Sequence, residues 1–307
     1  MRLGIAGCGR IVERGYMPAV LATEGVTIAA FADPNPDRLD QCLRLWREGG
    51  GEAEGFADLG DLLAAAPIDL LVVAAPLDRH VTLAEEAAVA GVRSLVEKPP
   101  APDLAGAQRL AALNPEPLLA FNRRFLQGTE LREAIPAEGW IEIDLELRFR
   151  QGAWGAHEVR DEALLDAGIH LVDLACHLSG AAPIAVRSAR VEPQRASFEI
   201  EMSRGRARIE CATDRSHREA IGVRDRSGRQ LASTTWGGLR SRLAARVNGT
   251  DPLVLSLQRQ LEAFTAGGPI ATARDGVTTM AIVEAARRSA ELDGAEVTVE
   301  LVAEAAP

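Results

Sequence analysis

The sequence is 307 residues long and 47% hydrophobic, which gives length for two domains and enough apolar side chains for proper cores. Its net charge of −10 and pI near 5.2 argue against a nucleic-acid partner, because a phosphate-binding surface needs a concentrated basic face. The four cysteines lie far apart without a CxxC pair, so we expect neither a zinc site nor a disulfide framework.

A membrane location is not expected either. The first apolar run begins at Leu3, which leaves no room for a signal peptide. No apolar stretch approaches the roughly 20 residues of a membrane span. We therefore expect a cytoplasmic protein without a membrane partner.

Short apolar runs alternate with helical stretches up to about residue 122. The runs are continuous, as in buried parallel strands, and cover residues 3–6, 26–32, 70–75, 92–96 and 118–121. The helical stretches are rich in Ala, Leu, Glu and Arg and cover residues 11–23, 36–47, 58–66, 78–90 and 103–113. This repetition predicts an α/β fold with a doubly wound parallel sheet as a first domain over residues 1–122.

The rhythm changes at Trp140. Apolar and charged residues alternate strictly over 141–149, which is typical of an antiparallel strand with one polar face. A helix is predicted over 162–178, further strands over 185–191, 197–202 and 207–212, closing helices over 253–264 and 276–292, and a last strand over 297–301. Residues 123–307 are therefore expected to form an α+β domain on a large open sheet.

A glycine-containing turn, Gly7-Cys8-Gly9-Arg10-Ile11, follows the first predicted strand and begins the first helix. A dinucleotide site needs glycines here for a tight turn and for backbone approach to a pyrophosphate, next to the positive end of a helix. The third glycine of the usual pattern is replaced by Val12, at a position that serves packing. An ordinary tight turn is the alternative.

Asp33 ends the second predicted strand, 33 − 9 = 24 residues after Gly9, close to the roughly 20 residues expected for a ribose-binding acid. A carboxylate there accepts hydrogen bonds from both ribose hydroxyls and repels a 2′-phosphate. NAD is therefore favoured over NADP. The alternative is a turn, Asp33-Pro34-Asn35-Pro36, that only caps the next helix.

The chain has one lysine, Lys98, among 34 basic residues, and it lies in Glu97-Lys98-Pro99 directly after a predicted strand. An arginine stays protonated near neutral pH, whereas a lysine can be desolvated and exchange a proton. The single lysine is a candidate catalytic cation, although one lysine can also occur by chance.

Asp166, His170 and Asp173 have the spacing i, i+4 and i+7 within the helix predicted over 162–178. That spacing places the three side chains on one helix face, among aliphatic residues. A lone histidine is usually structural. Two carboxylates in register with it favour an acid–base group, because a nearby anion favours imidazolium and fixes the ring.

These motifs together resemble the glucose-fructose oxidoreductase, inositol dehydrogenase and MocA (Gfo/Idh/MocA) family over nearly the whole chain. They are GCGRI at the start, ADP around Asp33, APLDRH at 75–80, EKP at 97–99, FNRRF at 121–125 and LLDAGIHLVDLACHLSG at 164–180. The resemblance implies a Rossmann domain, a second domain with a large mostly antiparallel sheet, and a substrate cleft between them. It also implies a homodimer or homotetramer assembled through the open sheet face.

The resemblance also implies residue roles. Lys98 would orient the substrate oxygen, Asp166 would support it, His170 would be the general acid–base, and Asp173 would bind substrate or steady His170. Lys98 would replace a metal as electrophile. The implied cofactor contacts are Gly7, Cys8, Gly9, Arg10, Ile11, Asp33, Ala75, Pro76, His80, Glu97, Lys98 and Asn122. Arg124, at the crossover between the domains, is an expected substrate contact.

Some positions depart from the family pattern or extend it. Arg160-Asp161-Glu162 replaces a run of glycines before the catalytic helix. Trp154 is a candidate for stacking on a sugar ring, His157 for a substrate contact and Trp236 for a third contact, against the alternative of surface loops. Because the only tyrosine, Tyr16, falls in the first helix, a tyrosine-dependent reductase mechanism is not expected.

The expected function is an NAD-dependent oxidoreductase acting on a secondary alcohol or ketone of a sugar, cyclitol or related polyol. Hydride transfer leaves a hydroxyl proton for an imidazole to remove, while a cation on the same oxygen lowers the barrier. Two alternatives stay open. One is an NAD-retaining glycosidase or epimerase of the same fold, and the other is a non-catalytic nucleotide-binding regulator.

Overall fold

The computed structural model describes residues 1–126, 128–154, 162–237 and 251–301. The chain forms two compact units. Unit 1 comprises Met1–Leu126 and Thr250–Gly276, and unit 2 comprises Gln127–Gly249 and Val277–Pro307. This division differs from the expected domain boundaries in two segments, because residues 123–126 and residues 250–276 both belong to unit 1.

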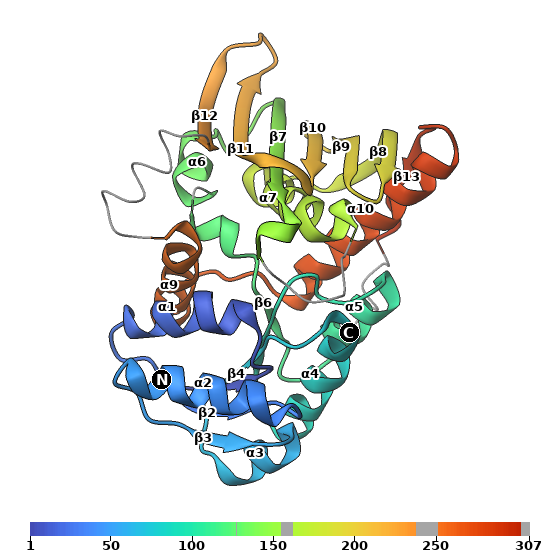
Figure 1. The fold of residues 1–307 in the computed structure, drawn as a ribbon. Coiled ribbons are helices and arrows are strands. Elements are labelled where there is room, and N and C mark those ends of the chain that lie inside the picture. The colour runs from blue at the N-terminus through green and yellow to red at the C-terminus, as the bar shows by residue number, and fades with distance from the viewer. Residues whose placement is uncertain (127, 155–161, 238–250, 302–307) are drawn as a thin grey trace. The chain divides into compact units, whose positions relative to one another are not determined.

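Unit 1 is built on a six-stranded parallel sheet (Figure 1). The strands are β1 (Arg2–Ala6), β2 (Thr27–Ala32), β3 (Glu54–Phe56), β4 (Leu70–Val73), β5 (Ser94–Val96) and β6 (Leu118–Leu119). Their order, β3-β2-β1-β4-β5-β6, is that of a dinucleotide-binding fold, with the order reversing between β1 and β4. The predicted doubly wound sheet is confirmed. Only β3, which is short and partly exposed, lacks the continuous apolar run that marked the other strands.

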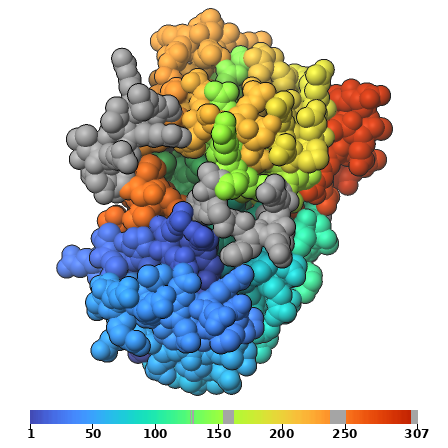
Figure 2. All heavy atoms as spheres, viewed as in Figure 1, coloured from blue at the N-terminus to red at the C-terminus, as the bar shows by residue number. Residues whose placement is uncertain are grey.

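The helices of unit 1 follow the strands in alternation. They are η1 (Val12–Tyr16), α1 (Met17–Leu21), α2 (Pro36–Glu48), α3 (Leu59–Ala65), η2 (Leu77–Arg79), α4 (His80–Val89), α5 (Leu104–Ala111) and η3 (Asn122–Phe125). Asn35, Asp58 and Asp103 cap α2, α3 and α5, because each side chain accepts a hydrogen bond from a backbone N–H in the first turn. Figure 2 shows the outer surface of α2 in blue.

Helix α9 (Pro252–Thr265) belongs to unit 1 although it comes late in the chain. Leu257 and Leu261 are buried in the same core cluster as Tyr16 and the apolar side chains of β1 and β2. A Cβ at Gly15 would lie 2.7 Å from Leu257 Cδ1, so α9 lies directly against η1. This burial explains why residues 250–276 belong to unit 1.

Unit 2 is built on a seven-stranded sheet with the order β12-β11-β7-β10-β9-β8-β13 (Figure 1). The strands are β7 (Ile141–Arg150), β8 (Pro183–Glu192), β9 (Arg195–Met202), β10 (Gly205–Ala212), β11 (Asp214–Asp225), β12 (Gln230–Gly237) and β13 (Val297–Thr298). The sheet is mostly antiparallel, as expected. Strand β7 departs from its antiparallel prediction on one side, because it pairs parallel with β10 and antiparallel with β11.

The helices of unit 2 are α6 (Gly128–Ala134), η4 (Gln151–Trp154), η5 (Leu164–Gly168), α7 (Ile169–Ser179) and the part of α10 (Ala273–Glu291) from Val277 onward. Helix α7 ends at Gly180, whose φ of 59° is the left-handed conformation that glycine adopts at helix C-termini. Arg287 of α10 forms a salt bridge with Glu162, two residues before η5.

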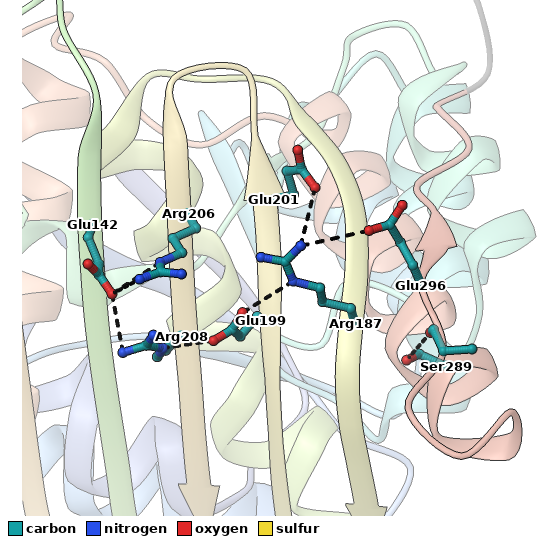
Figure 3. A network of polar contacts seen from close by, with 9 residues as sticks. Glu142, Arg187, Glu199, Glu201, Arg206, Arg208, Ser289 and Glu296 are labelled. Atoms are coloured by element: carbon teal, nitrogen blue, oxygen red, sulfur yellow. Dashed lines mark hydrogen bonds and ion pairs between the residues drawn. The ribbon is translucent and has the colours of Figure 1, made fainter. Parts of the chain in front are cut away.

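One face of the unit 2 sheet is covered with charged side chains in register across neighbouring strands (Figure 3). Glu142 of β7 pairs with Arg206 and Arg208 of β10, and Arg208 pairs in turn with Glu199 of β9. Arg187 of β8 continues the network to Glu199, Glu201 and Glu296. On β7, this is the polar face that the strict alternation over residues 141–149 predicts. A hollow of about 650 Å³ lies on this face, lined by parts of β7 to β12.

Candidate functional site

The glycine turn of unit 1 is shaped by its contact with the segment after β4. Gly7 has a φ of 101°, and a Cβ there would lie 2.5 Å from the Ala74 carbonyl oxygen, so only glycine can occupy the position. The Gly7 N–H donates to the carbonyl oxygen of Ala32 (2.8 Å), which ties the turn to the end of β2. The turn therefore lies at the carboxyl edge of the sheet, next to the point where the strand order reverses.

Gly9 differs from Gly7 because none of the described residues requires its small size. A Cβ at Gly9 would meet no atom of the described structure within 4 Å. Its carbonyl oxygen accepts hydrogen bonds from Val12 and Glu13, so Gly9 directly precedes the first helical turn. The first N–H groups of a helix have no intrahelical acceptors and attract anions. Open space beside them fits close approach by a pyrophosphate.

Asp33 is buried and organises the turn directly. Its carboxylate accepts the Cys8 N–H at 2.7 Å through one oxygen and the Asn35 N–H at 2.8 Å through the other. Asp33 therefore shapes the turn before α2, as the alternative reading of the sequence expected, and it also holds the glycine turn, whereas its contact with a ribose stays a prediction. Each carboxylate oxygen can accept more than one hydrogen bond, so this arrangement is compatible with ribose hydroxyls.

The first helix begins with a π turn, which its sequence did not predict. The Met17 N–H donates to the Val12 carbonyl oxygen, an i→i+5 bond. Val12, which replaces the third glycine, is fully buried and packs in the core as expected. The Cys8 thiol lies in the same core beside Cys42, and this contact together with burial raises its pKa well above the ordinary value. Cys8 therefore contributes its backbone N–H rather than a reactive thiolate.

Lys98 follows β5, whose end is joined to β4 by a hydrogen bond from the Glu97 N–H to the Val73 carbonyl oxygen (3.0 Å). Glu97 is buried and accepts hydrogen bonds from the Tyr16 hydroxyl (2.8 Å) and the Lys98 N–H (3.1 Å). Burial raises the pKa of Glu97, while these two donors and the Lys98 charge oppose the shift. The buried Glu97 carboxylate therefore fixes the backbone of the loop after β5 through the Lys98 N–H. The Lys98 side chain remains partly exposed at the carboxyl edge of the sheet.

His80 joins the loops after β4 and β5. Its Nδ1 lies 2.8 Å from the Pro99 carbonyl oxygen, and its Nε2 lies 2.9 Å from the Ala75 carbonyl oxygen. The ring is 2% exposed. His80 is therefore a buried residue that contacts the two loops carrying Ala75, Pro76 and Lys98.

In unit 2, the predicted catalytic residues lie on η5 and α7. Asp166 is half-buried on the π turn η5, whereas His170 and Asp173 are buried on α7. The Ile169 N–H donates to the Leu164 carbonyl oxygen, so the helix is wider here than the α-helix assumed from the sequence. Single π turns inside α-helices are frequent at functional sites, because they re-aim side chains without ending the helix.

Two contacts of this helix, one made by Asp166 and one made at Gly168, could not be predicted from the sequence. Gln151 follows β7, and its Nε2 donates to Asp166 Oδ2 at 3.0 Å. Gly168 lies where a Cβ would come 3.0 Å from Leu164 Cδ1 and 3.1 Å from Cys211 Sγ, so the helix approaches β10 closely. Both contacts restrict the direction of Asp166 and the path of the helix. A polar residue at the end of a strand was the only signal available for Gln151.

The remaining predicted contacts have mixed outcomes. The Asn122 amide donates to Ser256 Oγ (3.0 Å), and Arg124 forms an ion pair with Asp275 (3.5 Å), so both have protein partners within unit 1. Trp236 is half-buried on β12, opposite Glu219 of β11. The backbone of Trp154 ends η4, and His157 lies outside the described residues. The roles assigned to these residues remain predictions.

The described ranges contain neither a candidate membrane-spanning helix nor a candidate metal cluster. No helix within them combines the length and apolar character that crossing a membrane requires. In the same ranges, no three His, Cys, Asp or Glu side chains lie close enough together to hold a metal ion. The 650 Å³ hollow on the charged sheet face is lined by none of the predicted site residues that the structure describes.

Residues 1–117 match the model of the GFO_IDH_MocA family, described as an oxidoreductase family with an NAD-binding Rossmann fold. Over this segment the chain is similar to the NAD-binding domain of the Gfo/Idh/MocA family. The matched segment holds the glycine turn, Asp33, His80 and Lys98. Residues 1–117 of unit 1 therefore correspond to the NAD-binding Rossmann fold that this family model describes.

Among the curated proteins similar to this chain, the rhizopine catabolism protein MocA of Rhizobium meliloti is 27% identical over 96% of this chain and 97% of its own length. D-apiose dehydrogenase of Paraburkholderia graminis is 28% identical over 57% of this chain and 49% of its own length. The chain spans about half of the length of several of the curated relatives it matches.

A solved structure confirms the fold over the whole chain. Myo-inositol dehydrogenase from Lactobacillus casei, in complex with NAD(H) and myo-inositol, has a TM-score of 0.78 and 15% identity, and covers 99% of this chain and 98% of its own. At this identity the likeness concerns the fold alone. The chain thus shares the fold of this structure, a Rossmann sheet followed by a large mostly antiparallel sheet.

Proposed function

We propose that the protein is an NAD-dependent oxidoreductase acting on a secondary alcohol or ketone of a sugar, cyclitol or related polyol. The observation that carries the proposal is the placement of the single lysine within unit 1. Lys98 follows β5 at the carboxyl edge of a sheet that also presents the Gly7 turn, Asp33 and Ala75. Open α/β sheets bind their ligands at this edge, near the reversal of strand order.

The residues of unit 1 fit NAD rather than NADP. Asp33 presents a carboxylate at the end of β2, where it accepts hydrogen bonds from the protein and has further acceptor capacity. A 2′-phosphate would meet that negative charge. NAD, when bound, supplies the nicotinamide carbon that accepts or donates the hydride.

The protein's own residues would manage the proton and the charge on the reacting oxygen. Lys98 would hold the substrate oxygen by charge and hydrogen bonding, and Asp166 would support that orientation. His170 would take the hydroxyl proton during oxidation and return it during reduction, because an imidazole exchanges protons near neutral pH. Gln151 supports the proposal by holding Asp166 through Oδ2, which limits the positions the carboxylate can take.

Relatives support the substrate class without fixing the substrate. Names among them include inositol 2-dehydrogenase and galactose 1-dehydrogenase. We infer a polyol or sugar for this chain and place the protein in the cytoplasm. A homodimer or homotetramer formed through the open face of the unit 2 sheet is the assembly that the family resemblance implies.

The deciding experiment is a screen of sugars, inositols and nucleotide-activated sugars with NAD at alkaline pH, monitored by NADH absorbance. We expect net NADH from at least one polyol and its loss in the His170→Asn variant. NAD that co-purifies with the protein, combined with substrate conversion but no net NADH, would instead indicate an NAD-retaining glycosidase or epimerase. Binding of NADH without any conversion would indicate a regulator.

A further inference from the structure

The ring of His80 lies between two backbone carbonyl groups, and this arrangement has a chemical consequence. We propose that His80 is held as an imidazolium cation that cross-links the loops after β4 and β5 and thereby positions Lys98. His80 is then a positioning residue rather than a direct cofactor ligand. The consequence for turnover rests on the proposed function, whereas the protonation state does not.

Two backbone carbonyl oxygens face the nitrogens of the His80 ring. Nδ1 lies 2.8 Å from the Pro99 carbonyl oxygen and Nε2 lies 2.9 Å from the Ala75 carbonyl oxygen. A carbonyl oxygen can only accept a hydrogen bond, and a neutral imidazole has one N–H and one nitrogen lone pair. In either neutral tautomer, one ring nitrogen would direct its lone pair at a carbonyl oxygen. Only the imidazolium donates to both oxygens.

Burial opposes this state, and the hydrogen bonds favour it. The ring is 2% exposed, and an isolated buried charge is strongly disfavoured. Hydrogen bonds from a charged donor are roughly twice as strong as neutral ones, and His80 makes two of them in this state. Charged groups lie on α4, which begins at His80, and on the segments around it: Glu97 and Lys98 after β5, Asp78 and Arg79 on η2, Asp61 on α3, Glu85 and Glu86 on α4, and Asp103 and Arg109 at α5.

The two acceptors connect the cation to the candidate catalytic residue. Pro99 directly follows Lys98, and Ala75 lies two residues after the end of β4, the strand that pairs with β5. The ring therefore closes a bridge between two adjacent strand ends at the edge where Lys98 emerges. Loss of the proton removes one of the two bonds, so the Lys98 loop becomes less restrained as the pH rises.

Nuclear magnetic resonance of the full chain tests the protonation state directly. The protein has five histidines, so single His→Gln variants assign each ring in ¹⁵N-labelled protein, and four variants suffice if His80→Gln does not fold. At pH 7.5 an unperturbed imidazole is about 10% protonated. We expect more than half of His80 to carry protons on both nitrogens at this pH. A His80 ring with one protonated nitrogen at pH 7.5 overturns the proposal.

The single lysine provides the readout for positioning. Reductive methylation with ¹³C-formaldehyde labels two amines, Lys98 Nζ and the Met1 α-amino group, and leaves both charged. We expect the Lys98 methyl signal to shift over the pH interval in which His80 loses its proton, and this step to disappear in His80→Gln. The Met1 signal serves as the control. A Lys98 signal that is indifferent to His80→Gln shows that His80 does not position the loop.

Kinetics separate this inference from the proposed function. If a substrate is found, His80→Gln is expected to lower kcat by at least tenfold while KM for the polyol changes less than threefold. His177→Gln, on the opposite end of the candidate catalytic helix from Asp166, is the control. If no substrate is found, the proposed function fails, and the two resonance experiments still decide the state and effect of His80. Unchanged kcat in His80→Gln contradicts the positioning role.

Discussion

The hydroxyl of Tyr16 donates a 2.8 Å hydrogen bond to Glu97 Oε1, and this bond connects the first helix of the nucleotide domain to the loop that carries Lys98. Tyr16 is the only tyrosine in the chain and is fully buried. Burial is the largest cause that raises the pKa of Tyr16 well above its ordinary value, and the neighbouring Glu97 carboxylate adds to it. Tyr16 thus acts as a neutral donor to a buried acid, not as a catalytic proton carrier.

Tyr16→Phe should destabilise the protein by about 1–3 kcal/mol, because it removes a donor from a buried carboxylate. The Tyr16 bond lowers the pKa of Glu97, whereas burial raises it, so the bond favours the charged form. The loss of unfolding free energy caused by Tyr16→Phe should therefore be larger at pH 8 than at pH 5. Urea unfolding at both pH values measures it. Thr23→Val removes a buried hydroxyl whose acceptor is the neutral Ala19 carbonyl, so its loss should not depend on pH. Equal losses at both pH values for Tyr16→Phe would contradict this reading of Glu97.

Lys98→Arg should lower kcat by about 10²–10⁴-fold, the range typical of a lost acid–base or charge-stabilising group. The substitution keeps a positive charge, but the guanidinium is larger and does not exchange its proton near neutral pH. Steady-state kinetics on the substrate found in the screen measures the effect. Arg93→Lys, at an exposed position just before β5, adds a lysine elsewhere and should be neutral. Retention of most of the turnover in Lys98→Arg would remove the special role of lysine.

Asp33→Asn should reduce the preference for NADH over NADPH by at least about tenfold in Kd, equivalent to about 1.4 kcal/mol. The amide removes the charge that opposes a 2′-phosphate. It also presents an NH₂ group toward one of the two backbone N–H donors, so NADH binding should weaken as well. Calorimetry with both nucleotides measures the ratio. Asp103→Asn, at the cap of α5, is the matched control and should leave the ratio unchanged. Tighter binding of NADPH than NADH by the unmodified protein would contradict the role of Asp33.

Gly168→Ala should destabilise unit 2 although alanine is the better helix former. Helix propensity favours alanine by about 1 kcal/mol, whereas overpacking costs about 1–3 kcal/mol. The new Cβ would lie 3.1 Å from Cys211 Sγ and 3.0 Å from Leu164 Cδ1. Thermal unfolding should show a lower Tm for Gly168→Ala and a smaller loss when Cys211→Ala is present. Gly222→Ala, where a Cβ meets nothing within 4 Å in the described structure, is the control. Additive effects of the two substitutions would show that the sulfur does not limit this position.

Glu199→Gln tests the charged face of the unit 2 sheet. The hydrogen bond from Arg208 is the largest cause that lowers the pKa of Glu199, and Arg187 adds to it. Because the pKa of Glu199 is lower in the folded protein than in the unfolded chain, where it is about 4.3, the charged carboxylate stabilises the fold at pH values above about 4.3. This stabilisation is lost as the pH falls through the folded-state pKa. The pair is partly exposed, so we expect a loss of about 0.5–1 kcal/mol at pH 7 that shrinks toward pH 3 and in high salt. Urea unfolding measures it, and the exposed Glu210→Gln on β10 is the control. A loss that persists at pH 3 would exclude an electrostatic origin.

Local hydrophobic patterns predict much of the fold. The continuous apolar runs predicted β1, β2, β4, β5 and β6 because a strand buried on both faces needs apolar side chains at every position. Strict alternation predicted β7, and its polar face carries Glu142 in the charged network. Strands β11 and β12 were missed because they are half-exposed and rich in polar residues, so neither pattern marks them. Their assignment depends on pairing with β7 and with each other.

The candidate site likewise contains residues that the local sequence reveals and contacts that it does not. The glycine turn, Asp33, Lys98 and the Asp166/His170/Asp173 spacing can be recognised from the sequence, because each depends on residue type and on short spacings within one segment. The partners of these residues cannot, since Tyr16 and Glu97 are 81 positions apart and Gln151 and Asp166 belong to different elements. Helical spacing also could not reveal the π turns at Val12–Tyr16 and Leu164–Gly168.

The sequence by itself determined the strand and helix rhythm, the position of the nucleotide turn and the identity of the single lysine, because these follow from local periodicity and side-chain chemistry. Only the tertiary structure decided that α9 returns to unit 1, that Glu97 is bound by Tyr16, and that His80 lies between the carbonyls of Ala75 and Pro99. Hydrogen bonds and packing between distant segments form when the chain closes on itself, and no local pattern encodes their partners.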